Sequence, residues 1–158
     1  MDLPGAALRP ATSADAAELL VLQRCCWVQE ALLNDTLAHP ALSETLDEVR
    51  ESIESWDSWV VRHGPRLIGA VRARTVGDGW EIGRLMVAPD LVGRGLGRFL
   101  LAHAEQQAPP EAKQFVLFTG ARSERNIALY ERAGYRRTEM PFEPTGVFTK
   151  AVYLVKPR

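Results

Sequence analysis

Three alternate glycines, Gly93, Gly95 and Gly97, interrupt an apolar stretch at residues 86–101. The stretch reads MVAPDLVGRGLGRFLL, an apolar run that ends at a proline and an aspartate and begins again after the glycines. A strand, a glycine-rich loop and a helix in this order direct main-chain N–H groups and the positive end of the helix at one point, which suits a phosphate group. The spacing alone leaves open a tight strand-to-helix turn that binds nothing.

Two better-known phosphate loops do not fit these glycines. The dinucleotide fingerprint G-x-G-x-x-G, counted from Gly93, requires a glycine where Arg98 stands. A Walker A loop requires Gly-Lys followed by Ser or Thr, and the lysines of the chain, Lys113, Lys150 and Lys156, all lie outside the loop. The sequence therefore predicts a phosphate loop of another type.

Histidines and cysteines give no sign of metal or covalent chemistry. His39, His63 and His103 are far apart in the sequence, and neither a CxxC nor an HExxH pattern occurs, so we expect no metal site. Cys25 and Cys26 are adjacent, which does not suit ordinary disulfide geometry, and neither has a paired histidine. We expect two reduced side chains on a helix.

Composition indicates an ordinary folded protein. The chain is 46% hydrophobic and 25% charged, with a formal net charge of −1, so no nucleic acid or membrane surface is expected as a partner. Its length suits a single domain over residues 1–158. The first ten residues lack the pattern of a signal peptide, and no apolar run is long enough to span a bilayer, so we expect a cytoplasmic protein.

Hydrophobic periodicity and turn residues predict a mixed α/β sheet with helices on both faces. Ser13 and Ser43 are the expected helix caps. The predicted strands cover residues 6–12, 58–63, 66–75, 80–89, 114–120, 135–140 and 147–156. The predicted helices cover residues 13–33, 42–55, 96–107 and 123–134.

Two segments carry a specific resemblance. LMVAPDLVGRGLGRFLL, residues 85–101, resembles the acetyl-CoA signature of the GNAT N-acyltransferases, R/Q-x-x-G-x-G/A, with Val92 where the family usually has Gln or Arg. SERNIALYERAGY, residues 123–135, is similar to the second cofactor segment of that family, with asparagine at Asn126 in place of the commoner position of Ser123. The resemblance implies the GNAT fold, with a mixed, mostly antiparallel sheet, and acetyl-CoA as cosubstrate.

The resemblance also implies which residues bind the cofactor. Main-chain groups of the strand would pair with its pantetheine arm, and the loop amides would hold the pyrophosphate. The implied cofactor-binding residues are Leu85, Met86, Val87, Val92, Gly93, Arg94, Gly95, Leu96, Gly97, Arg98, Asn126 and Tyr130.

Two side chains are candidates for catalysis. Tyr130 resembles the general acid of the family, which protonates the departing thiolate, although its spacing also suits a core aromatic residue. Glu81 is the best carboxylate for a general base, and an exposed charge at the start of a strand is the alternative. Glu30 and Asp35 are alternatives for binding a cationic amine.

The implied function is an N-acetyltransferase that moves an acetyl group from acetyl-CoA to a primary amine by direct sequential transfer. Trp27, Glu30, Asn34 and Asp35 suggest a polar, mildly acidic acceptor pocket. A small-molecule amine or amino acid, a peptide N-terminus and a protein lysine all stay open, and the near-neutral charge favours a small molecule. A CoA-binding regulatory module without catalysis is the alternative from another class. The chain would act as a monomer or a homodimer.

Overall fold

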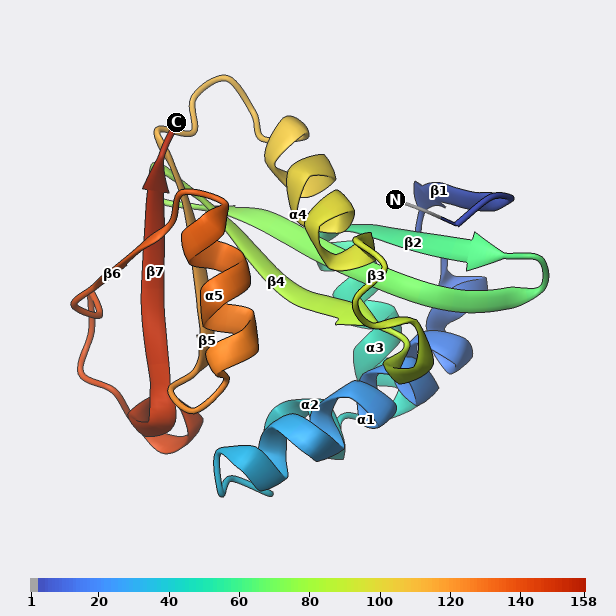
Figure 1. The fold of residues 1–158 in the computed structure, drawn as a ribbon, viewed down its shortest axis with the longest axis horizontal. Coiled ribbons are helices and arrows are strands. Elements are labelled where there is room, and N and C mark those ends of the chain that lie inside the picture. The colour runs from blue at the N-terminus through green and yellow to red at the C-terminus, as the bar shows by residue number, and fades with distance from the viewer. Residues whose placement is uncertain (1–2) are drawn as a thin grey trace.

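The computed structural model describes residues 3–158, which form a seven-stranded mixed sheet of order β1-β2-β3-β4-β5-β7-β6 (Figure 1). The strands are β1 (Ala6–Pro10), β2 (Asp57–His63), β3 (Arg66–Val76), β4 (Gly79–Val87), β5 (Gln114–Gly120), β6 (Arg136–Thr138) and β7 (Ala151–Pro157). The helices are α1 (Ala16–Leu33), α2 (Pro40–Ser43), α3 (Leu46–Ser55), α4 (Leu96–Gln106) and α5 (Glu124–Arg132). Short 3-10 segments cover Ser13–Asp15, Pro89–Leu91 and Gly146–Lys150.

Strand pairing confirms the predicted mixed, mostly antiparallel sheet. Every neighbouring pair is antiparallel except β4 and β5, which run parallel. The parallel register covers Gly79–Gln114, Trp80–Phe115 and Glu81–Val116, and it ends there although both strands continue. The sheet therefore opens into a fork after Glu81.

A β-bulge in β4 lies next to this fork. The register between β3 and β4 shifts between Ala70 and Arg72, and Arg84 takes a left-handed φ of 47°. A bulge of this kind places one extra residue on its strand and turns a side chain away from the normal alternation. Arg84 therefore faces a different side of the sheet from the one that a regular strand would give it.

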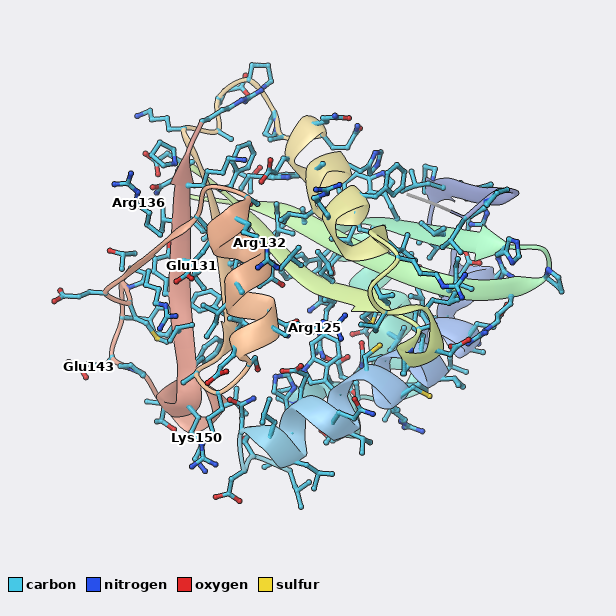
Figure 2. The ribbon with its side chains drawn as sticks, in the orientation of Figure 1. Arg125, Glu131, Arg132, Arg136, Glu143 and Lys150 are labelled. Atoms are coloured by element: carbon cyan, nitrogen blue, oxygen red, sulfur yellow. The ribbon has the colours of Figure 1, made fainter. Side chains whose placement is uncertain are left out.

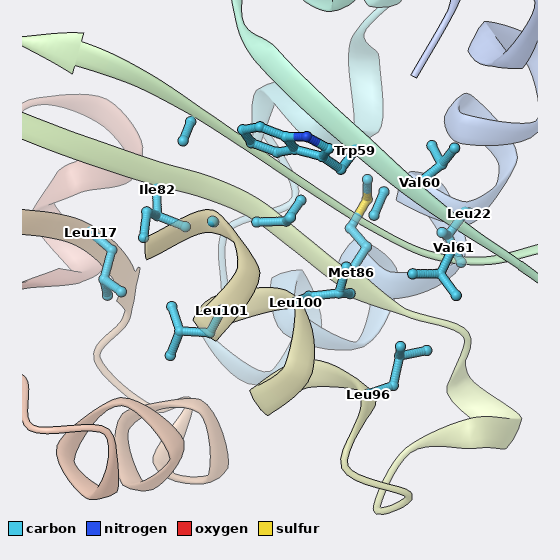
Figure 3. Close-up of a cluster of buried hydrophobic side chains, with 14 of the residues drawn as sticks. Leu22, Trp59, Val60, Val61, Ile82, Met86, Leu96, Leu100, Leu101 and Leu117 are labelled. Atoms are coloured by element: carbon cyan, nitrogen blue, oxygen red, sulfur yellow. The ribbon is translucent and has the colours of Figure 1, made fainter. Parts of the chain in front are cut away.

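Helices cover both faces of the sheet, as predicted (Figure 1). A side chain at Gly69 of β3 would lie 3.1 Å from Leu96 and Leu100, so glycine at this position lets α4 approach one face. On the other face, α1 and α3 pack together over β2, β3 and β4. The core lies between these layers (Figure 3), and burial of each leucine in it stabilises the fold by about 2 kcal/mol.

Both helix starts differ from the predicted caps. The first helical turn begins after Thr12, whose N–H donates to the Asp15 carboxylate at 2.9 Å, so Ser13 lies inside a 3-10 turn and not at the cap. The cap of α3 is Thr45, which forms a reciprocal capping box with Glu48. Ser43 was the wrong cap because Thr45 and Glu48 satisfy each other: the Glu48 carboxylate accepts from the N–H of Thr45, and the Thr45 hydroxyl accepts from the N–H of Glu48.

Three strands, β7, β6 and β1, are shorter than predicted. Residues 147–150 form a 3-10 turn that follows Gly146 (φ 55°), so β7 begins at Ala151. The Lys150 carbonyl accepts from the N–H of Ala121, and this bond fixes the turn beside the end of β5. Residues 135–140 contribute only β6, and β1 stops at Pro10, which has no N–H for a further ladder bond.

Candidate active site

The glycine loop lies between β4 and α4 and contains two left-handed residues. Gly93 has φ 94° and Gly95 has φ 80°, conformations that a side chain disfavours. A Cβ on Gly95 would meet no atom within 4 Å, so its surroundings are open. Gly97 has no positive φ, and a Cβ there would lie 3.6 Å from Leu85 and Leu129. The backbone conformation therefore favours glycine at the first two positions, whereas a Cβ at Gly97 would make ordinary van der Waals contacts.

The first turn of α4 is open to an anion. Gly95 is the N-cap and has no side chain with which to accept from the N–H groups of the first turn, while its carbonyl accepts from Phe99. Arg94 and Arg98 are exposed beside it. Arg125 projects from α5 toward the loop, with Nη2 3.9 Å from the position of a Gly93 Cβ (Figure 2). Free N–H groups, a helix N-terminus and guanidinium groups together suit a phosphate.

The edge of β4 that faces the fork presents main-chain groups. The N–H of Ala88 donates to Ile68 of β3, so alternation along the strand points the main-chain groups of Val87 and Leu85 away from β3 and toward the fork. The Val87 carbonyl accepts from the Cys26 thiol at 3.3 Å. Met86 is buried and its main chain faces β3. Of the three predicted strand residues, two therefore offer N–H groups to the fork.

The other predicted loop residues lie around the same opening. Val92 is 40% exposed, and Leu96 is buried in the core. The side chain of Val92 has no group that could bind a phosphate, so its position offers only the main chain. Leu96 anchors the first turn of α4, because its side chain lies against Gly69 on the sheet.

Tyr130 on α5 is 8% exposed and packs edge-to-face against Tyr135, with ring centroids 6.0 Å apart. Burial, and secondarily the charge of Glu30, raise the pKa of the Tyr130 phenol. The Tyr135 hydroxyl donates to Glu105, whereas that of Tyr130 has no such partner within residues 3–158. Tyr130 is therefore protonated at neutral pH, with an O–H group that can donate to a ligand.

A hydrogen-bond network joins the end of α1 to the start of α5 on the opposite arm of the fork. The Asn34 amide donates to Ser123 at 3.0 Å, and the Ser123 hydroxyl donates to Glu30. Asn126 donates to Glu30 at 3.1 Å. Asn34 fits against Gly120, where a Cβ would lie 2.3 Å from its amide nitrogen. The predicted cofactor residue Asn126 therefore has a protein partner for its amide.

The residues of the expected acidic acceptor pocket have partners within the fold. Glu30 accepts from Ser123 and Asn126, and Asn34 is only 4% exposed. Asp35 pairs with Lys150 at 3.2 Å. Glu30 is thus held by α5, whereas the Asp35 side chain is 84% exposed, and a role for either carboxylate in binding an amine stays a prediction.

Glu81 lies at the base of the fork. It pairs with Arg74 of β3 and with Val116 of β5 in the strand register, and this is the last residue pair before β4 and β5 separate. Its side chain is 17% exposed, and its carboxylate accepts from Arg74 Nε at 2.9 Å. The carboxylate is therefore fixed in place by one exposed arginine.

Arginines that the sequence analysis did not single out lie on the same side of β4 as Glu81. Arg84 pairs with Glu44 and stacks over Trp27, 5.0 Å from the ring centroid. Arg72 donates to Ser52, and its guanidinium carbon lies 4.2 Å from the Trp56 ring centroid. We refer to Arg72, Arg84 and Glu44, with Arg74 and Glu81 beside them, as the bulge cluster. Only the bulge brings Arg84 to this side, so its place could not be predicted from alternation.

A sheet forked between two parallel strands, with a glycine loop and a helix N-terminus beside the fork, defines an α/β acyltransferase fold. The chain belongs to the acetyltransferase (GNAT) family, whose family model matches residues 19–135. The predicted family and fold are thereby confirmed.

Known proteins are similar to this chain over most of its length. UPF0157 protein YqkA of Bacillus subtilis is 25% identical over 147 residues, which are 90% of this chain and 41% of that protein, so the chain spans less than half of its length. The fold is similar to that of PaiA N-acetyltransferase from Thermoplasma acidophilum in complex with coenzyme A (TM-score 0.81, 15% identity, 97% of this chain and 99% of that one). It is also similar to the ribosomal-protein-S18-alanine N-acetyltransferase of Escherichia coli (TM-score 0.71, 19% identity, 96% and 93%).

The described residues contain neither a membrane-spanning helix nor a cluster of metal-binding side chains. No helix within residues 3–158 is both long and apolar enough to cross a membrane. Among the same residues, no three His, Cys, Asp or Glu side chains are grouped in a way that could hold a metal ion.

Proposed function

We propose that this protein is an acetyl-CoA-dependent N-acetyltransferase that transfers the acetyl group directly to a primary amine. The fork between β4 and β5 is the observation that carries the proposal. It connects a glycine loop suited to phosphate with a buried, protonated tyrosine, and main-chain N–H groups line one arm between them. The complex of the similar T. acidophilum fold with coenzyme A supports the same ligand here.

Each part of the fork suits one part of this ligand. The loop from Gly93 to Arg98 would hold the pyrophosphate through N–H groups of the α4 first turn, with Arg125 close by. The free edge at Leu85 and Val87 would pair with the amide groups of the pantetheine arm, as a further strand would. Gly97 lies beside this edge, since a Cβ there would be 3.6 Å from Leu85 and 3.8 Å from Val87.

Acetyl-CoA supplies an activated thioester when it is bound, and the chain supplies the remaining chemistry. The N–H groups of β4 stabilise the negative charge that develops on the acyl oxygen. Tyr130 donates its proton to the departing sulfur. Glu81, directly or through water, accepts the proton that the amine must lose before it can attack.

Direct transfer fits the state of the nearest thiol. Burial raises the pKa of Cys26 to about 11, with the hydrogen bond to Val87 acting in the opposite direction. A thiol with this pKa is almost entirely protonated at neutral pH and is a poor nucleophile. No acyl-enzyme on Cys26 is therefore proposed.

Tyr130→Phe tests this assignment. The variant keeps the ring and its packing against Tyr135 and removes only the hydroxyl, so kcat should fall by about 10- to 10³-fold. Affinity for acetyl-CoA should change by less than about 1 kcal/mol, the net value of one hydrogen bond. Thioester consumption with an amine panel measures the first quantity, and titration calorimetry with CoA measures the second.

Two results would contradict the proposal in different ways. Full activity of Tyr130→Phe would make Tyr130 a packing residue and leave thiolate departure to solvent. Tight CoA binding by the natural protein without thioester consumption for any amine would instead favour the CoA-binding regulatory module.

A further inference from the structure

Two buried guanidinium groups of the bulge cluster have N–H groups without partners. Arg84 has a side chain that is only 10% exposed, yet its Nη1 makes no hydrogen bond within residues 3–158. Arg72 Nε is also buried, and it too has no partner among these residues. An unpaired polar group inside a protein is costly, by about 1–3 kcal/mol and more when it is charged. Two such groups side by side indicate a missing acceptor.

The charges of the bulge cluster are also unbalanced. Arg84 pairs with Glu44, and Arg74 pairs with Glu81, which leaves the charge of Arg72 without a carboxylate of its own. The charged groups that act on Arg72 are Arg84, Glu44, Arg74 and Glu81. Burial lowers the pKa of Arg72 to about 10, so it stays ionised at neutral pH. The cluster therefore carries one excess positive charge.

The missing acceptor has a place to bind. Arg72 and Arg84 line one end of a cavity of about 30 Å³ whose other walls are mainly apolar, and Met86 and Val49 are among them. This volume accommodates about two water-sized groups, which is the size of the two oxygens of a carboxylate. A planar guanidinium matches that geometry better than a single point charge does.

Two features of the chain connect the arginines of this cavity with the fork. Arg84 directly precedes Leu85, whose main chain faces the fork. Glu81, the candidate base, belongs to the same cluster of side chains. A carboxylate bound by the two arginines would hold an amine a few bonds away near both the reacting carbonyl and the base.

We propose that the acceptor is an amino acid or a similar short amine with a carboxylate, and that Arg72 and Arg84 bind this carboxylate. The inference rests on the proposed N-acetyltransferase function and specifies its substrate class. It disfavours a polyamine, because a second cationic group would face the excess positive charge.

Matched acceptor pairs test the inference. Each of the twenty common L-amino acids is compared with its carboxamide, in acetyl transfer and in calorimetric binding to the CoA-bound protein. At least one acid should exceed its amide by about 10- to 100-fold in kcat/KM and in affinity, the range expected for charged hydrogen bonds. Amidation lowers the pKa of the neighbouring amine and supplies more free amine at neutral pH, so amine reactivity cannot cause this preference.

Variants of the two arginines locate the effect. Arg72→Gln and Arg84→Gln should each reduce the preference for the acid toward unity and leave CoA affinity unchanged. Arg84→Gln leaves Glu44 without its arginine partner. If this single variant unfolds, the double variant Arg84→Gln with Glu44→Gln is used in its place. Arg50→Gln, an exposed arginine of α3 paired with Asp47, is the matched control and should keep the preference.

The outcomes separate the two proposals. Equal transfer to acids and amides, or an acid preference that persists in both arginine variants, overturns the inference and leaves the acetyltransferase function standing. Binding of no amino acid to the CoA-bound protein also overturns it, since water would then be the only occupant of the cavity. Absence of CoA binding and of thioester consumption overturns the proposed function itself.

Discussion

Two groups of arginines and carboxylates lie on the sheet, and they differ in how completely their charges are paired. Near the N-terminus, Asp15 accepts from both guanidinium nitrogens of Arg9 at 2.7 Å and from Arg62 at 3.1 Å, and Arg62 also pairs with Glu18. We call this group the β1–α1 cluster. It has two arginines and two carboxylates, whereas the bulge cluster has three arginines and two carboxylates.

The difference shows what each cluster does. In the β1–α1 cluster the side chain of Asp15 is only 2% exposed, and the N–H of Thr12 adds a further bond, so the cluster joins β1, β2 and the start of α1. Such a satisfied network stabilises a fold. In the bulge cluster, buried N–H groups of Arg72 and Arg84 have no acceptor, at a cost in stability that packing does not explain. Sites that lose stability in this way are often sites of function.

The largest change in the free energy of unfolding is expected at Asp15. Asp15→Asn keeps the shape of the side chain and removes its charge, so the free energy of unfolding should fall by about 3 kcal/mol, the lower end for a broken buried ion pair because Arg9 is half exposed and can be rehydrated. Urea unfolding followed by circular dichroism measures this loss. The transfer rate of the folded variant should match that of the natural protein.

The same carboxylate should make stability depend on acid. Hydrogen bonds from Arg9 chiefly, and from Thr12 and Arg62, hold the pKa of Asp15 well below its ordinary value of 3.8. Its contribution is therefore complete above about pH 4 and is lost as the pH falls toward the lower folded-state value. The Asn variant should lack this part of the acid dependence, and an unchanged dependence would contradict the assignment.

Glu81→Gln, in the bulge cluster, should lower the transfer rate and change the free energy of unfolding little, the opposite of Asp15→Asn. As a general base, Glu81 should account for at least about 10² of the rate at neutral pH, with partial recovery at high pH as free amine becomes available. The free energy of unfolding should change by less than about 1 kcal/mol, since Arg74 is half exposed and water can replace its partner. A pH–rate profile identical to that of the natural protein would transfer the role of base to water or to another residue.

Arg72→Met should have the smallest effect on stability. It removes a buried, incompletely paired charge together with its bond to Ser52, so the free energy of unfolding should stay within about 1 kcal/mol of the original. Arg62→Met is the matched comparison, because all of its partners are carboxylates or carbonyls and their loss leaves Asp15 less well paired. Equal losses in the two variants, by urea unfolding, would remove the distinction between the clusters.

Local patterns predicted the glycine loop and most of the strands and helices, although the helix predicted over residues 42–55 is divided in the structure into α2 and α3. The glycine spacing predicted a strand–loop–helix unit, and the left-handed φ at Gly93 and Gly95 confirms that these positions need glycine. Leu46, Val49 and Ile53 of α3, which lie at helical spacing, pack together on the core. These features depend on neighbours in the sequence, and they could therefore be predicted from it.

Features that depend on distant parts of the chain could not be predicted from the sequence. A regular strand would place Arg84 on the same face as Trp80, which bonds to α4, and only the bulge turns it to the other side, toward Glu44. Likewise, the sequence did not show that Glu30 and Asn34, both expected in the acceptor pocket, form hydrogen bonds with Ser123. The assignments of Tyr130 and Glu81 remain predictions.

Under the two proposals above, β4 would recognise the acyl donor and the acceptor through different groups. Its edge presents main-chain groups, which every residue type possesses, while its bulge presents one side chain. A substitution at position 84 would then change which amine is accepted and leave the affinity for the acyl donor intact.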